Sequence, residues 1–90
     1  MYLNGKLISG ELDLNTNDFI VKQFKQLATE SNLSENQLTK IMRYLDSHPN
    51  VDGQVLTLYD QMPIFLNQEE VANVLDDLRY IQSMYQSNNE

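Results

Sequence analysis

The predicted architecture rests on residues 18–45, which read DFIVKQFKQLATESNLSENQLTKIMRYL. Apolar residues recur at the spacing of a helical face in the first half of this stretch and again in the second half. Between the two stripes, Ser34-Glu35-Asn36-Gln37 matches the capping box that begins many helices. We therefore predict one helix over residues 18–30. A second should start at Ser34 and end before Pro49, because the residue that precedes proline avoids the helical conformation.

The flanking segments complete the predicted order of elements. Residues 67–70, Asn-Gln-Glu-Glu, form a second capping-box pattern, and the apolar stripe that follows as far as Tyr85 predicts a long C-terminal helix. Residues 55–59 fit either a strand of a hairpin around Asp52-Gly53 or a short helical turn. Near the N-terminus, Asn4-Gly5 is typical of a tight hairpin turn with positive φ, although a turn in an ordered arm fits the pattern equally.

These elements predict a single, mainly α domain of three to four helices with a short N-terminal turn or hairpin. Residues 1–14 are expected to form the N-terminal arm or hairpin, residues 15–86 the helical body, and residues 87–90 a frayed tail. A winged helix-turn-helix is the structural alternative. The predicted core consists of apolar residues on the helix faces and in the segment between them: Ile20, Phe24, Leu27, Leu38, Ile41, Met42, Leu45, Leu56, Leu58, Val71, Leu75, Leu78 and Ile81.

The composition limits the function classes that the chain fits. Its 90 residues include no Cys, one His, 13 acids and six Lys or Arg, which gives a net charge of −7. The lack of Cys excludes a disulfide scaffold, a zinc ribbon and a thiol nucleophile. Residues 1–45 hold five acids and five bases, whereas residues 46–90 hold eight acids and one base, so the whole net charge lies in the second half. Such an acidic half attracts basic proteins and repels nucleic acid, or it only keeps the protein soluble.

Candidate catalytic and metal-binding residues are few. His48 has no motif that supplies a nucleophile or an orienting carboxylate, so we expect it to be a structural residue at a helix end. Asp76 and Asp77 point about 100° apart on a helix, which places them on a solvated face rather than around one ion. Asp52-Gly53 lacks the other ligands of a calcium loop. We therefore predict a protein that is not an enzyme and holds no metal and no cofactor.

One pattern resembles the helix-turn-helix of winged-helix regulators. It covers roughly residues 20–65, with a small residue in the first helix, Asn32 in the turn, apolar residues on the second helix and a possible wing after it. The second helix would then face the major groove of DNA. The negative net charge opposes such binding, because DNA affinity depends on Lys and Arg. The DNA-binding residues of this alternative are Ser34, Asn36, Gln37, Lys40 and Arg43.

A second pattern combines His48-Pro49, Gly53 and Tyr59 with helices on either side. It resembles the colicin and pyocin nuclease immunity proteins, a family of acidic four-helix domains of nearly this length. The resemblance implies a four-helix fold and an acidic, tyrosine-bearing surface that keeps a basic nuclease away from its substrate. Carried onto this chain, it implies contacts by Glu35, Asp46, Asp52 and Tyr59.

The sequence therefore predicts a small acidic binding protein that inhibits a basic, nucleic-acid-handling protein. An immunity protein, an antitoxin or an inhibitor encoded by a mobile element would each act in this way. Charge would set the orientation and rate of association, and Tyr59, close to Asp52 and next to Asp60, would supply affinity. The predicted partner-binding residues are Glu35, Asp46, Asp52, Tyr59 and Asp60.

Two further expectations concern location and alternative functions. We expect a cytoplasmic protein, because the sequence begins with no apolar run of signal-peptide length and no segment reaches the length of a membrane span. The first alternative function is the helix-turn-helix regulator of DNA. The second is an assembly module that associates with itself through Tyr80, Met84 and Tyr85.

Overall fold

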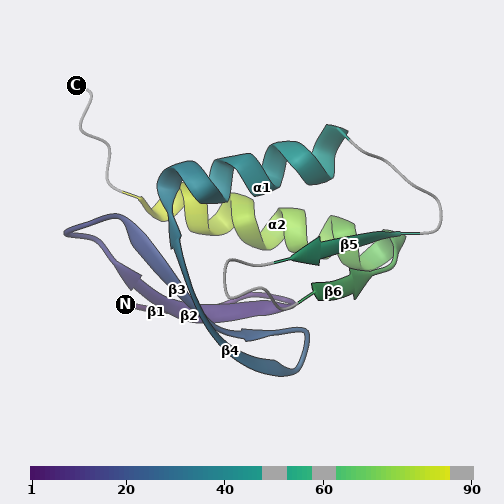
Figure 1. The fold of residues 1–90 in the computed structure, drawn as a ribbon. Coiled ribbons are helices and arrows are strands. Elements are labelled where there is room, and N and C mark those ends of the chain that lie inside the picture. Colours follow the sequence, from purple (N-terminus) through teal and green to yellow (C-terminus); the bar gives the residue numbers. More distant parts are fainter. Residues whose placement is uncertain (48–52, 58–62, 86–90) are drawn as a thin grey trace.

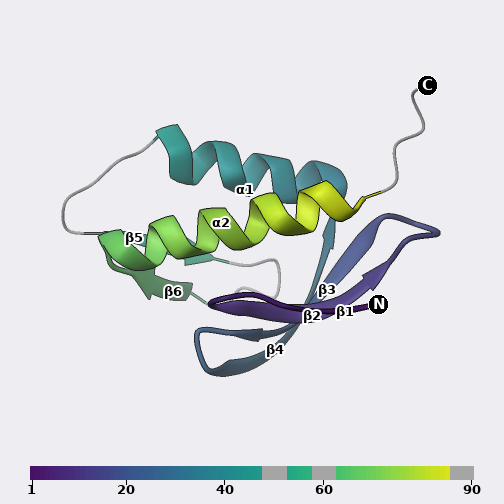
Figure 2. The same ribbon diagram turned by 180° about the vertical axis from the view of Figure 1, so that it is seen from behind.

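The structure is a computed structural model that describes residues 1–47, 53–57 and 63–85. Four antiparallel strands form one sheet in the order β1–β2–β3–β4, and two further strands form a small sheet of their own. The two helices lie side by side over one face of the four-stranded sheet (Figure 1 and, from behind, Figure 2). The elements are β1 (Tyr2–Asn4), β2 (Ile8–Asp13), β3 (Asp18–Phe24), β4 (Leu27–Ser34), α1 (Glu35–Ser47), β5 (Gln54–Thr57), β6 (Pro63–Leu66) and α2 (Gln68–Met84).

The predicted mainly α fold of three to four helices is wrong, because the chain forms an α+β domain. Strand β3 and the first half of β4 occupy the place of the helix predicted over residues 18–30. The helical body predicted for residues 15–86 therefore begins with strands. The helix-turn-helix is also missing, since its first helix is a hairpin, and the four-helix fold implied by the resemblance to immunity proteins is not the fold of this chain.

Strand β3 has apolar residues at helical spacing, which explains why the sequence predicted a helix there. Phe19 and Val21 are buried while Ile20 between them is only partly buried, which is the two-residue period of a strand. A shift in the pairing register between Val21 and Gln23 then returns Phe24 to the buried face. Ile20 and Phe24 therefore keep a helical spacing in the sequence although they belong to a bulged strand.

The turn between β3 and β4 carries no conventional sequence signal. Lys25 and Gln26 both adopt positive φ, 54° and 75°, between the paired residues Phe24 and Leu27. Two-residue hairpin turns of this kind usually contain Asn, Asp or Gly, because other residues are strained in the left-handed region. Leu27, which we predicted in the core, lies directly after this turn and is 44% exposed.

One apolar core lies between the four-stranded sheet and the helices. Most of the predicted core residues on the helices and on β5 are buried in it, while Met42 and Val71 are partly buried against it. Ile20 is only partly buried, and Leu58 lies outside the described residues. The prediction missed mainly the strand residues, because it placed helices or an arm there. The buried residues that it missed are Leu3, Ile8, Leu12, Phe19, Val21, Leu33, Ile64, Leu66, Val74 and Tyr85.

Both predicted capping boxes are confirmed. At the start of α1, the Gln37 N–H donates to Ser34 Oγ at 3.3 Å, and Gln37 Oε1 accepts from the Ser34 N–H at 2.9 Å. At the start of α2, the Glu70 N–H donates to Asn67 Oδ1 at 2.8 Å, and Glu70 Oε1 accepts from the Asn67 N–H at 2.9 Å. These bonds satisfy backbone groups that a helix end otherwise leaves open, so short sequence motifs are enough to start both helices.

Residues 54–57 form strand β5, so the described part of residues 55–59 adopts the strand, one of the two conformations that the sequence left open. Strand β5 pairs with β6. Residues 48–52, which precede Gly53, lie outside the described residues. Gly53, just before β5, has a φ of 94°, and a Cβ atom there would lie 2.2 Å from the carbonyl oxygen of Leu66. The glycine thus allows β5 to begin close beside the end of β6.

Asp77 on α2 holds the turn between β1 and β2. Its side chain does not lie on the solvated face that we predicted, since the residue is only 4% exposed. The carboxylate accepts hydrogen bonds from three successive backbone N–H groups, those of Lys6 at 2.8 Å, Leu7 at 2.7 Å and Ile8 at 3.0 Å. The hydrogen bonds of the buried carboxylate are thereby satisfied, and they hold the backbone of the turn in place.

Gly5 has a different role from the one its sequence pattern indicates. Neither Asn4 nor Gly5 has a positive φ, so the predicted tight turn with left-handed residues does not form. Instead, a Cβ atom on Gly5 would lie 2.5 Å from the carboxylate of Asp77. The glycine is needed because the turn wraps closely around that side chain.

We expect Asp77→Ala to lower the free energy of unfolding by about 3 kcal/mol, because it leaves three backbone N–H groups without their acceptor. Urea unfolding followed by circular dichroism measures this loss. Asp77→Asn retains one acceptor oxygen and should lose less.

Asp76→Ala is the matched control, because Asp76 is exposed on the same helix and only forms surface ion pairs with Lys6 and Arg79. It should cost less than about 1 kcal/mol. Equal losses for Asp76→Ala and Asp77→Ala would contradict the role assigned to the buried carboxylate.

Candidate functional site

The predicted partner-binding residues do not come together in one described surface. Glu35 and Asp46 are both exposed, but they lie near opposite ends of α1, about 16 Å apart along its axis. Asp52, Tyr59 and Asp60 lie outside the described residues. Only Glu35 therefore enters the site described below.

The residues of the DNA-binding alternative lie at the beginning and on the surface of α1. Ser34 and Gln37 are engaged in the capping box. Asn36, Lys40 and Arg43 are exposed, but the helix that would precede them in a helix-turn-helix is the β3–β4 hairpin. The arrangement that would place these residues in a major groove is therefore missing.

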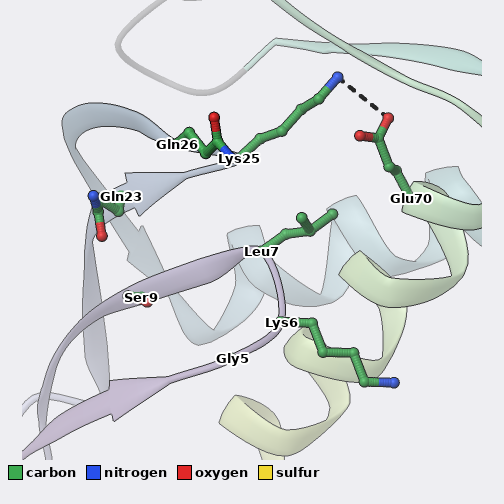
Figure 3. A pocket seen from close by; sticks show the side chains of 8 residues that line it. All are labelled: Gly5, Lys6, Leu7, Ser9, Gln23, Lys25, Gln26 and Glu70. Carbon is green, nitrogen blue, oxygen red and sulfur yellow. Dashed lines mark ion pairs between the residues drawn. The ribbon is translucent and has the colours of Figure 1, made fainter.

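A polar hollow of about 390 Å³ lies where the turns of the sheet meet the start of α2 (Figure 3). Its cations are already neutralised. Lys25 Nζ lies 3.2 Å from Glu70 Oε1 and donates to the Phe65 carbonyl oxygen at 2.8 Å, while Lys6 Nζ points away and pairs with Asp76 at 3.0 Å. The residues around the hollow are Gly5, Lys6, Leu7, Ser9, Gln23, Lys25, Gln26 and Glu70.

This hollow is a structural junction. The Lys25 N–H also donates to the Leu7 carbonyl oxygen at 2.8 Å, so the β3–β4 turn is tied to the β1–β2 turn as well as to α2. The Asn67 N–H and, after it, the Lys25 ammonium hold the pKa of Glu70 below its ordinary value, which keeps that carboxylate charged. Its lining pairs no nucleophile with a base, so it has no catalytic arrangement.

Three acids gather at another place, which we call the acidic end. Asp13 and Asp18 face each other across β2 and β3, and Asp18 pairs in turn with Ser34, the residue before Glu35. Asp13, Asp18 and Glu35 have no ion-pair partner among the described residues. Like charges directly across strands are unfavourable, so this arrangement costs stability.

Most other charges in the described part of the chain are paired. The pairs join the N-terminal amine to Glu11, Lys6 to Asp76, Lys22 to Glu30, Lys25 to Glu70, and Arg79 to Asp76. Two of these pairs connect bases of the first half to acids of the second half. A count of charges in each half does not show this neutralisation. The acidic excess of residues 46–90 is thus partly neutralised, while acids of the balanced first half are left open.

Tyr85 at the end of α2 adjoins the acidic end. The residue is 9% exposed, and its hydroxyl group is buried with no hydrogen-bond partner among the described residues. Burial, together with the smaller effects of the negative charges of Glu35 and Asp18, raises the pKa of Tyr85 to about 12. The end of α2 and the start of α1 indeed lie at the same end of the molecule (Figure 1).

The sequence pattern offered little sign of this site. Asp13 and Asp18 lie in the half of the chain whose charges balance, and Tyr85 reads as the last apolar position of a helix. Only the pairing of β2, β3 and β4 brings these residues beside Glu35. Burial alternates along β3, but its sequence DFIVKQF has three apolar residues in a row, so it gave no strand signal that would have placed Asp18 beside Asp13.

Comparison with known proteins gives no relative for this chain. No model of a known family, no curated protein and no solved structure matches it. Among the described residues, no helix is long and apolar enough to cross a membrane, and no three His, Cys, Asp or Glu side chains are grouped to hold a metal ion. The site is therefore interpreted from its own geometry.

Tyr85→Phe tests the environment of the buried hydroxyl group. At pH 7 we expect the variant to be as stable as the natural protein or more stable by about 1 kcal/mol, because it removes a buried polar group without a partner. The tyrosine of the unfolded chain ionises near pH 10 and that of the folded chain near pH 12. The natural protein should therefore lose stability as pH rises from 10 to 12, by at most about 3 kcal/mol.

Urea unfolding at several pH values measures both effects. Other groups also titrate above pH 10, so the informative quantity is the difference between Tyr85→Phe and the natural protein. That difference should grow between pH 10 and 12, and a constant difference would refute the assignment.

Proposed function

We propose that this protein is a small, acidic, non-catalytic binding protein that inhibits a basic, nucleic-acid-handling protein. An immunity protein, an antitoxin or an inhibitor encoded by a mobile element would each fit. The observation that carries the proposal is the acidic end, where Asp13, Asp18 and Glu35 lie together without cations to pair with them.

Carboxylates without ion-pair partners in the described part of the chain, held at the ends of β2 and β3 and at the start of α1, suit this task physically. They present negative charge in fixed positions, much as nucleic acid presents phosphates, so they attract the same basic surfaces. Most carboxylates elsewhere in the described part pair with Lys, Arg or the N-terminal amine, and they contribute less to the outward field. Asp13 accepts a hydrogen bond from the neutral Asn15 N–H at 2.9 Å, a bond that leaves its charge in place. We therefore assign the contact surface to Asp13, Asp18 and Glu35, whereas Asp52 and Tyr59 lie outside the described residues.

The alternatives have less support. DNA binding would depend on Lys40 and Arg43, exposed cations without an ion-pair partner in the described part of the chain, against a net charge of −7. Self-association through the end of α2 would need an open apolar patch. Tyr80 is exposed there, but Met84 is half-buried and Tyr85 is buried in the core.

An affinity experiment with source-cell lysate tests the proposal. We expect the natural protein to retain a basic nucleic-acid-binding protein at low salt and to release it as salt rises. The purified partner should lose its activity on nucleic acid when this protein is added. The variant Asp13→Asn/Asp18→Asn/Glu35→Gln should lose both retention and inhibition.

Glu30→Gln/Asp46→Asn/Glu69→Gln is the matched control, because it removes the same number of negative charges from exposed positions elsewhere. It should keep most of the binding. Retention of nucleic acid without protein would overturn the proposal and direct attention to Lys40 and Arg43. Equal losses for the two triple variants would show that net charge, not the acidic end, binds the partner.

A further inference from the structure

We propose that Asp18, Glu35 and the hydroxyl group of Tyr85 together bind the guanidinium group of one arginine side chain of the partner, an inference that rests on the proposed function. The acidic end would then contain a specific binding site for one arginine, in addition to its general attraction for basic surfaces. The three residues come from the start of β3, the start of α1 and the end of α2.

The first argument is the unsatisfied hydroxyl group of Tyr85. A buried hydroxyl that forms no hydrogen bond costs folding free energy, and most buried polar groups therefore have a partner. This hydroxyl has none among the described residues, although the side chain around it is packed into the core. A donor that reached it from outside would recover a bond that the free protein lacks.

The second argument is the charge that surrounds this hydroxyl group. Asp18 pairs across the strands with Ser34, the residue before Glu35, and the end of α2 lies at this same end of the molecule (Figure 1). Glu35 and Asp18 accordingly contribute, through their negative charges, to the raised pKa of Tyr85. They supply two carboxylates on two different elements and have no ion-pair partner among the described residues. Two carboxylates and a phenol oxygen form a set of hydrogen-bond acceptors that calls for a cationic donor.

No cation in the described part of the chain pairs with Asp18 or Glu35. Arg79 pairs with Asp76, and Lys22 pairs with Glu30. Lys40 and Arg43 lie in later turns of α1, away from its first residue. We therefore assign the cation to another molecule.

Arginine fits this set better than lysine or a metal ion does. Its planar guanidinium group carries five N–H donors, so one side chain can reach acceptors on separate elements, and it is less strongly hydrated than an ammonium group. Ca²⁺ and Mg²⁺ take six or more oxygen ligands, and no three His, Cys, Asp or Glu side chains among the described residues, those of the acidic end included, are placed to hold a metal ion. Neither metal therefore matches the site.

The test uses the full-length protein with 13C at the Cζ atom of tyrosine and the peptide acetyl-GRGRGR-amide as probe. The resonance of Tyr85, identified by its loss in Tyr85→Phe, should shift on addition of the peptide. Binding measured by calorimetry should weaken about ten-fold in Tyr85→Phe, because one hydrogen bond to a charged group is lost. The peptide acetyl-GKGKGK-amide should bind more weakly and shift Tyr85 less.

Asp18→Asn and Glu35→Gln should each weaken binding at least as much, whereas Asp46→Asn and Glu69→Gln should change it by less than two-fold. Equal affinity for the two peptides would overturn the assignment to arginine. Binding without a shift of the Tyr85 resonance, or with equal losses of affinity in all four acid variants, would contradict a specific site. Such results would show only a general attraction between the acidic protein and a basic peptide.

Failure of this inference can be distinguished from failure of the proposed function. If the partner from the lysate is bound and inhibited by Tyr85→Phe as well as by the natural protein, the arginine receptor is wrong and the proposed function stands. If no basic partner is recovered by the natural protein, the proposed function fails whatever the peptides do. Thermal unfolding confirms in each case that the variant remains folded.

Discussion

The carboxylate of Asp77 is the contact on which the arrangement of sheet and helices depends. It joins the middle of α2 to the turn between β1 and β2, some 70 residues earlier in the chain, through three backbone hydrogen bonds. Apolar packing has no direction of its own, so it does not fix how a helix sits on a sheet. A buried anion that needs three particular N–H groups does fix it, and Gly5 leaves the space that this close approach requires.

A second polar contact, made by Lys25, ties another turn of the sheet to α2. It links the β3–β4 turn to β6 and to the first turn of α2. Together with Asp77, it uses charges of one half of the chain to neutralise or satisfy groups of the other half. The consequence for function is indirect but important, because these pairs leave the carboxylates of Asp13, Asp18 and Glu35 as the unpaired group at one end of the domain.

At the acidic end, charged and polar groups lack, among the described residues, the partners that Asp77 and Lys25 have. Unpaired like charges and a buried hydroxyl group without a partner both reduce stability, and proteins retain such features mostly where they bind something. Glu35 was predicted as a contact residue from the sequence, whereas Asp18 and Tyr85 were not. Their grouping depends on strand pairing between segments that the sequence presents as a helix, so no local pattern could have revealed it.

By itself, the sequence determined both helices and their capping boxes, because those bonds join residues three positions apart. It also determined most of the core residues on α1 and α2, since their spacing follows the helical period. Only the tertiary structure decided the β3–β4 hairpin, whose turn residues Lys25 and Gln26 take positive φ without the usual Asn or Gly. It also decided the burial of Asp77 and the acidic end, because these depend on contacts between distant segments that no local spacing encodes.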